Sequence, residues 1–200
     1  MKDSFQNSVD DSGRHVIDDT SAMRALAHPD RLSILLFLLS ARSRTATECA
    51  AEVGISPSAC SYHLRELERF AYAERVEASD DGRTRPWRAA AIGFSIGNDW
   101  SDPSPAARAA RHALGRAELI ENHRLAHRYL DAVDSLDAQW QNATDFHNFE
   151  LVVTAEELAG LNEQVARLLR PYRAPTRTDS PDDAAAVHVV YQAFPRLDAT

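Results

Sequence analysis

The sequence predicts a mainly α protein with α+β elements, in which a helical unit carrying a β-hairpin precedes a long helix and a small β-α-β region. Two observations predict this arrangement. Apolar residues recur at helical spacing in four short stretches between residues 19 and 70, each bounded by Ser, Thr, Asp, Pro or Gly. Two β-prone stretches then meet at an Asp-Gly turn, and a helical pattern resumes after residue 101.

Composition is ordinary for a globular protein of 200 residues, with 44% hydrophobic and 26% charged residues. The longest strongly apolar run, residues 34–39, is far shorter than the ~20 residues of a membrane span, and the polar N-terminus has no secretory segment. We therefore expect a cytoplasmic protein without membrane contact. Cys49 and Cys60 lie at apolar positions of helical patterns, which favours buried thiols over a disulfide or metal ligands.

Four helices are expected in the first part of the chain, after a polar, Asp-rich and disordered tail over residues 1–18. The first begins at Asp19 or Thr20 and runs to Ala27. Pro29 opens the second, which ends near residue 40. Thr47 is interpreted as the cap of the third, over residues 48–53, which Gly54 ends. Ser56 and Pro57 open the fourth.

The fourth helix, within ISPSACSYHLREL, has two distinct faces. Cys60, Leu64 and Leu67 fall at i, i+4 and i+7 and form one buried stripe. The other face carries Ser58, Ser61, Tyr62 and Arg65. All four side chains end in hydrogen-bonding groups, and only one of them is charged. A helix face that is merely exposed to solvent would be richer in Glu and Lys.

A hairpin follows the fourth helix, because ERVEA and RTRPWRAAA flank the turn SDDG. Two helices that meet at a short turn, followed by a hairpin, form a winged helix-turn-helix, predicted here over residues 19–95. Overall net charge is −8, yet residues 20–90 hold ten basic and nine acidic side chains. The local charge therefore permits a nucleic-acid partner.

These features predict that the fourth helix and the hairpin contact double-stranded DNA. The alternatives are an ordinary solvated helix face and solubilising charge on the hairpin. Thr47 could equally be a plain cap, and His63 is expected half-buried, with a contact to the DNA backbone as the lesser alternative. The candidate DNA-binding residues are Thr47, Ser56, Ser58, Ser61, Tyr62, His63, Arg65, Arg83, Arg85 and Arg88.

Residues 96–200 are expected to hold a dimerisation helix and the β-α-β region. The helical pattern from residue 101 to about 140 is the longest in the chain, with Gly115 as a weak point. FELVV, residues 149–153, predicts a strand, and Thr154 with Glu157 forms a capping box for the next helix. AAVHVVYQAF, residues 185–194, predicts a final strand. The region would extend a dimer or form a pocket for an unknown small-molecule effector.

Residues 21–90 resemble the ArsR-type family of bacterial repressors. The resemblance lies in MRALAHPDRLSILLFL and in SPSACSYHLREL with its Ser61-x-His63-Leu64 core. It implies a dimeric repressor that reads a pseudo-palindromic operator. The tail, with FELVVTAEEL and VHVVYQAFP, is similar to the C-terminal extension of longer members.

The sequence departs from the metal-sensing members of that family. Thr45 and Thr47 stand where those members carry a Cys-x-Cys pair. His112 and His123 reproduce the spacing of a second kind of zinc site, but alanines occupy the other ligand positions. Ala71 replaces the glycine usual after the recognition helix, so this cap is expected to use another conformation or to bear strain.

The sequence therefore predicts a sequence-specific DNA-binding regulator, with no cofactor or metal. It is not expected to be an enzyme, since no nucleophile-base pair, glycine-rich phosphate loop or carboxylate constellation is evident. Two alternatives stay open at this point: a metal- or ligand-responsive sensor, and a winged-helix protein interaction module that never touches DNA.

Overall fold

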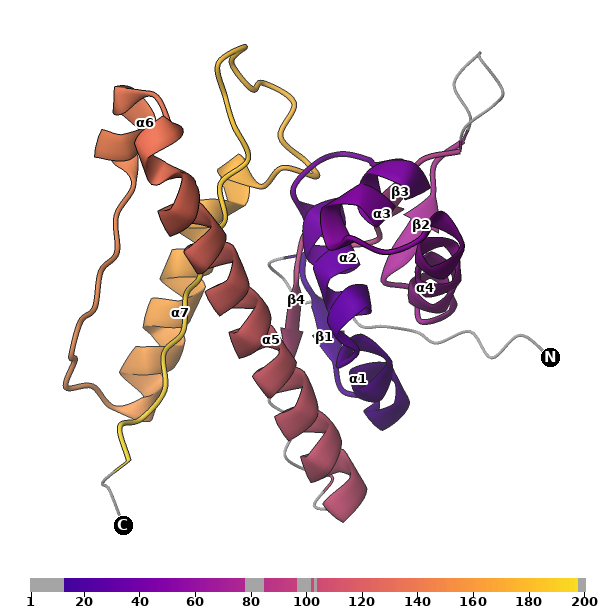
Figure 1. Ribbon diagram of the computed structural model, residues 1–200. Coiled ribbons are helices and arrows are strands. Elements are labelled where there is room, and N and C mark those ends of the chain that lie inside the picture. The colour runs from indigo at the N-terminus through magenta and orange to yellow at the C-terminus, as the bar shows by residue number, and fades with distance from the viewer. Residues whose placement is uncertain (1–12, 78–84, 97–101, 103, 198–200) are drawn as a thin grey trace.

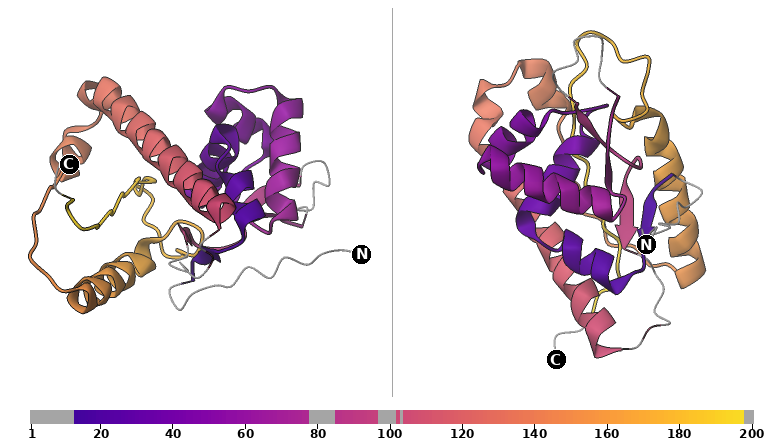
Figure 2. Two further views of the ribbon diagram at one scale, coloured as in Figure 1. Left: turned by 90° about the horizontal axis from the view of Figure 1, so that it is seen from below. Right: turned by 90° about the vertical axis from the view of Figure 1, so that its right-hand side faces the viewer.

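The computed structural model describes residues 13–77, 85–96, 102 and 104–197. A compact group of short helices forms one side of the molecule, and the long helix α5 crosses beside it (Figure 1). The last helix, α7, lies beyond α5 (Figure 2). Within the part of the chain that the structure describes, no helix is long and apolar enough to cross a membrane.

The four predicted helices of the first unit are confirmed. Their bounds are α1 Thr20–Leu26, α2 Pro29–Leu39, α3 Ala46–Val53 and α4 Pro57–Arg69. Each begins at a local signal: the Asp19 carboxylate accepts from Ala22 N–H, and Ser56 Oγ accepts from Ala59 N–H. Gly54 ends α3 in the left-handed conformation, with φ of 74°.

The expected cap of α3 is wrong. Thr45 caps this helix, with its Oγ1 accepting from Glu48 N–H while the Glu48 carboxylate accepts from Thr45 N–H. These reciprocal bonds form a capping box, which Thr47 cannot form because it has no Glu or Gln three residues later. Thr47 instead lies exposed in the first turn.

The hairpin arms are confirmed as β2 Ala73–Arg75 and β3 Trp87–Ala89, which pair in antiparallel register. The turn between them lies outside the described residues. Arg44 exchanges two backbone hydrogen bonds with Trp87, of 2.8 and 2.7 Å, so the segment before α3 adds a bridge to the hairpin. The hairpin is thereby fixed against the helical unit.

A second pair of strands was not predicted. β1, His15–Ile17, pairs in parallel with β4, Phe94–Ile96. The expectation of a disordered tail over residues 1–18 is therefore wrong for His15–Ile17, and residues 1–12 lie outside the described part of the chain. Ile17 is 1% exposed, and burial of this side chain stabilises so short a strand.

The core of the first unit extends into α5, Pro105–Ala132. Leu26, Leu32, Ile34, Leu38, Leu64 and Leu67 are almost fully buried, together with Leu114 of α5.

α5 runs unbroken through Gly115 and stops at Ala132, so the predicted helix to residue 140 is too long. A 3-10 turn, Val133–Ser135, and the short helix α6, Ala138–Ala143, follow it, and Gln141 Nε2 donates to the carbonyls of Val133 and Leu136.

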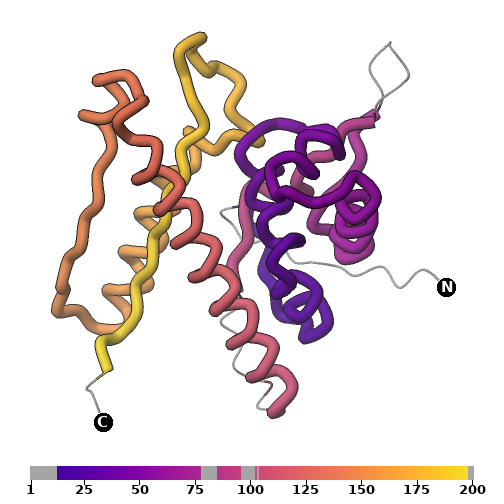
Figure 3. The backbone as a smooth tube through the Cα atoms, in the orientation of Figure 1, coloured from indigo at the N-terminus to yellow at the C-terminus, as the bar shows by residue number. Residues whose placement is uncertain are grey.

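The predicted strands at residues 149–153 and 185–194 are wrong for the single chain. Both stretches are extended but make no strand pairing among the described residues, as the smooth tube of Figure 3 illustrates. The helix between them is confirmed as α7, Ala155–Leu169, with the Thr154–Glu157 capping box. A 3-10 turn, Arg170–Tyr172, follows, and the chain then touches the first unit, where the Arg42 guanidinium donates to Arg177 O at 2.8 Å. A β-prone stretch becomes a strand only when another strand satisfies its backbone groups.

Candidate nucleic-acid interface

α4 separates its side chains into a buried and an open face, as the sequence predicts. Cys60, Leu64 and Leu67 are at most 1% exposed. On the opposite side Ser58 and Arg65 are exposed, Tyr62 is 52% exposed, and Ser61 is half-buried. The open face therefore presents hydroxyls, a phenol and a guanidinium without a carboxylate in the first turn.

Hydrogen bonds orient part of this open face. Ser56 Oγ lies 3.1 Å from Ser58 Oγ at the start of the helix, beside backbone N–H groups that the helix leaves unpaired. Arg65 Nε donates to Ser61 O at 3.1 Å, which lays the guanidinium along the helix toward its N-terminus. The positive end of the helix dipole and the arginine therefore favour an anion on the same surface.

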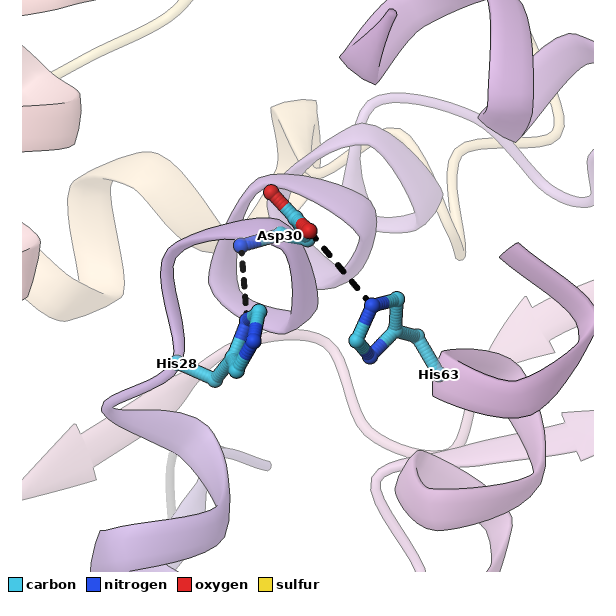
Figure 4. Close-up of side chains that lie close together, drawn as sticks. All are labelled: His28, Asp30 and His63. Carbon is cyan, nitrogen blue, oxygen red and sulfur yellow. Dashed lines mark hydrogen bonds and ion pairs between the residues drawn. The ribbon is translucent and has the colours of Figure 1, made fainter. Parts of the chain in front are cut away.

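His63 lies on the buried side of α4 and is only 7% exposed, so it is more deeply buried than expected. Its Nε2 lies 3.4 Å from a carboxylate oxygen of Asp30, at the start of α2 (Figure 4). His28 stands beside it, with ring centroids 4.7 Å apart, and its Nδ1 accepts from Asp30 N–H at 3.2 Å. The three residues join the start of α2 to the inner face of α4.

Burial lowers the pKa of His63, and the neighbouring His28 lowers it further, while the Asp30 carboxylate acts in the opposite direction. The neutral imidazole is therefore the form that suits this position. With Nε2 donating to Asp30, the neutral ring leaves Nδ1 without a hydrogen-bond partner in a buried place.

The same three side chains are a ligand set that a divalent cation can use. One ligand atom from each of His28, Asp30 and His63 lies within 4.8 Å of the others. Bonds of about 2.0–2.1 Å to zinc would draw such atoms closer together than this spacing, to roughly 3.5 Å. As arranged, the cluster forms a helix junction through the His28 cap of α2 and the Asp30–His63 contact.

The hairpin places its arginines unequally. Arg88 Nε donates to Glu74 Oε1 at 2.6 Å across the β2–β3 pair, so a neighbouring carboxylate balances its charge. Arg85 is exposed just before β3, and Arg83 lies outside the described residues. Arg75, which the sequence analysis did not select, stacks over the Trp87 ring with its guanidinium carbon 4.5 Å from the ring centroid.

The candidate residues therefore fall into three places. Ser56, Ser58, Ser61, Tyr62 and Arg65 share α4, Thr47 is exposed on the preceding helix, and Arg85 and Arg88 belong to the hairpin. His63 faces away from this surface. Its contact with Asp30 was not predicted, although the His-Pro-Asp run and the Ser-x-His-Leu core both lie within the stretches that carry the family resemblance.

The two cysteines are buried, as expected, with no exposed surface, and neither forms a disulfide. Cys49 of α3 and Cys60 of α4 share a side-chain hydrogen bond. That bond and burial raise the pKa of the Cys49 thiol, so it stays protonated. Here the thiols serve the packing of α3 on α4.

Residues 26–76, which include α2, α3 and α4, match the family model described as a helix-turn-helix domain. No relative among curated proteins matches the chain.

Solved structures that are faintly similar to this chain include several of Lactococcus lactis ZitR. A doubly substituted mutant in apo form has 16% identity and a TM-score of 0.31, with 70% of this chain and 83% of that chain covered. ZitR described as a zinc-responsive MarR family member has 15% identity and a TM-score of 0.30, covering 69% and 75%. ZitR in complex with DNA has 14% identity and a TM-score of 0.28, covering 68% and 73%. Structural similarity this low supports no argument about function.

Proposed function

We propose that this chain is a DNA-binding transcriptional regulator that acts as a dimeric repressor on a pseudo-palindromic operator. The open face of α4 is the observation that supports the proposal most strongly. It belongs to the second helix of the helix-turn-helix pair, and it leaves Tyr62 and Arg65 exposed while the opposite side of the helix packs into the core.

Each exposed group has a role in this proposal. Arg65 pairs with a guanine edge or a phosphate, and Tyr62 with the serines reaches base edges or phosphate oxygens in the major groove. Thr47 and the N-terminus of α4 contact the sugar-phosphate backbone of the DNA. Arg85 contacts a flanking phosphate or the minor groove. His63 is buried and holds α4 in place, so we assign it a positioning role rather than a contact.

The proposed regulator contacts two half-sites because it is a dimer. A two-fold dimer would place two α4 helices in adjacent major grooves, about 34 Å apart. This predicts an operator with two related half-sites. An effector that binds the C-terminal region stays a prediction.

A fluorescence-anisotropy titration tests the proposal. The protein is titrated against labelled DNA from upstream of its own gene and against an unrelated duplex, at about 50 and 200 mM salt. Tighter binding to its own upstream DNA, weakened by salt, is the expected result. Equal or absent binding would count against an operator there, and partner binding that survives replacement of Tyr62 and Arg65 by Ala would support a protein interaction module instead.

A further inference from the structure

Two extended segments of the C-terminal half expose apolar side chains that no other described part of the chain covers. The first segment, residues 146–153, holds Phe149 at 75% exposure and Val152 at 104%. The second segment, residues 187–194, ends in Phe194 at 76% exposure. The other large apolar residues exposed in these segments are Phe146, Leu151, Val153, Val187, Val189, Val190 and Tyr191.

The backbone of both segments is also open. Among the described residues, neither segment takes part in a backbone–backbone hydrogen bond or a strand pair. β-branched and aromatic residues dominate both, which is the composition of strands rather than of solvated loops. Each segment thus has two free strand edges and apolar side chains on both sides.

The fold keeps the two segments from pairing with each other in one chain. Figure 3 shows the first segment running along the outside from α6 to α7, while the second runs between α5 and α7. Two contacts hold the second segment there: His188 Nε2 lies 3.0 Å from Asn122 Oδ1 of α5, and the Tyr191 hydroxyl donates to Asn162 of α7 at 3.0 Å. Glu150 of the first segment forms an ion pair with Arg196, just after the second segment, with the carboxylate 3.5 Å from the guanidinium.

The surface around the segments is apolar as well. α7 buries only Ala166 and leaves Leu168 70% exposed. On α5, Ile120 is 69% exposed and Leu130 53%. If each exposed apolar side chain offers on the order of 100 Å², the region presents roughly 1,000 Å², more than a typical monomer leaves open and enough for one side of a stable interface.

We propose that a second copy of this chain covers this region, and that the 146–153 and 187–194 segments become β-strands by pairing with those of the partner. The inference specifies how the dimer of the proposed function is built and does not depend on DNA binding. Glu150 is the one carboxylate in the two segments, and they contain no Lys or Arg. Such a surface fits a permanent apolar interface between identical chains better than a charged or transient partner.

Symmetry favours the second copy for another reason. In a two-fold interface both copies use the same surface. The two segments of one copy can therefore pair with the open edges of the same two segments in the other copy. The exposed residues of α5 and α7 continue this surface and would pack against their equivalents.

The test uses the full chain without DNA, so that its failure is separate from failure of the DNA-binding proposal. Val152→Lys and Val189→Lys each place a charge in the proposed sheet, at side chains that the single chain leaves exposed and whose replacement spares the protomer. Ala51→Lys is the matched control, because it adds the same charge to an exposed position on α3, outside the proposed interface. Sedimentation velocity gives the mass, and hydrogen exchange reports protection of the amides in both segments.

We expect the wild-type protein and Ala51→Lys to sediment at twice the 22.2 kDa of one chain, with slow exchange in both segments. In the two valine variants, the dissociation constant should rise roughly 100-fold or more and the segment amides should exchange fast. A monomeric wild-type protein overturns the proposal. So does a dimer whose segment amides exchange fast, or one that both valine variants leave intact, since the contact would then lie elsewhere.

Discussion

His63 on the inner face of α4 and Asp30 at the start of α2 are in contact, with Nε2 and a carboxylate oxygen 3.4 Å apart. The two residues are 33 positions apart in the sequence, yet this contact helps to set where the proposed recognition helix lies. His63 is only 7% exposed, so placing a positive charge on its imidazole would lower the stability of the folded chain. The stability of the helix junction is therefore linked to pH.

The first prediction concerns acid. Burial lowers the pKa of His63 below its ordinary value of 6.5, so between these two values the unfolded chain binds more protons than the folded one. Stability should be constant above pH 6.5 for this group and should fall as pH drops below it. Burial lowers the pKa of His15 as well, so this residue acts in the same direction. Each can contribute a slope of up to about 1.4 kcal/mol per pH unit.

Urea unfolding of wild-type protein and of His63→Gln, at pH 7.5 and 5.5, measures the share of His63. Glutamine keeps a hydrogen-bonding group but cannot titrate here. We expect the variant to lose about 1 kcal/mol at pH 7.5 and to show a shallower fall on acidification. His112→Gln, at an exposed position of α5, should match wild type in both respects. An unchanged fall in His63→Gln would show that its titration is not linked to folding.

The second prediction concerns the end of α4. Ala71 has φ of 55°, the left-handed conformation that disfavours a residue with a Cβ atom. The bonds around it are those of a Schellman motif: Tyr72 N–H donates to Leu67 O at 2.8 Å, and Ala71 N–H donates to Glu68 O at 3.0 Å. Ala71→Gly should therefore raise the free energy of unfolding by roughly 1 kcal/mol.

Thermal or urea unfolding of Ala71→Gly checks this value. Ala59→Gly, in the first turn of the same helix, should do the opposite and lose up to about 1 kcal/mol, because glycine is a poorer helix former than alanine. The pair separates relief of the left-handed strain from a general effect of glycine. Equal losses in both variants would contradict the assignment of strain to Ala71.

Local signals allowed most of the helical unit to be predicted. Pro29 and the Ser56-Pro57 pair mark helix starts without reference to the rest of the chain, and α2 and α4 begin there. The expectation for Ala71 also came from its position just after α4. The capping box of Thr45 was just as local, since Glu48 stands three residues on, but the analysis placed the cap at Thr47.

Long-range partners account for the rest. β1 depends on β4, about 79 residues later, and three residues with alternating burial carry almost no periodic signal. The contact of His63 with Asp30 depends on how α4 lies across α2, which no spacing within either helix reveals. In the 149–153 and 185–194 stretches the β-prone composition was recognised, but pairing depends on a partner strand that the single chain does not bring to them.

The third prediction tests the open face of α4. Tyr62→Ala removes a side chain that is 52% exposed, and its loss should leave the fold intact because the buried stripe is untouched. Binding to the proposed operator should weaken about 10- to 100-fold, while binding to an unrelated duplex changes little, since a contact to base edges carries sequence information. Fluorescence anisotropy on both duplexes measures the two effects. A uniform loss on both would assign Tyr62 to the DNA backbone.

The last prediction concerns the hairpin arginines, which the structure separates. Arg88 donates to Glu74 at 2.6 Å, so its charge is already balanced and it should add little to phosphate binding. Arg85 is exposed next to the turn, where it can meet a phosphate. Arg85→Ala should weaken binding to every duplex and reduce the slope of log K against log salt by about 1.

Salt titrations of Arg85→Ala, Arg88→Ala and Arg167→Ala separate these roles. Arg167 lies exposed on α7, and its removal changes the net charge by the same amount at a distant place. We expect the slope to change in Arg85→Ala only. An equal change in all three variants would mean that DNA senses the overall charge of the protein, and a larger change in Arg88→Ala would mean that DNA displaces Glu74 from its arginine.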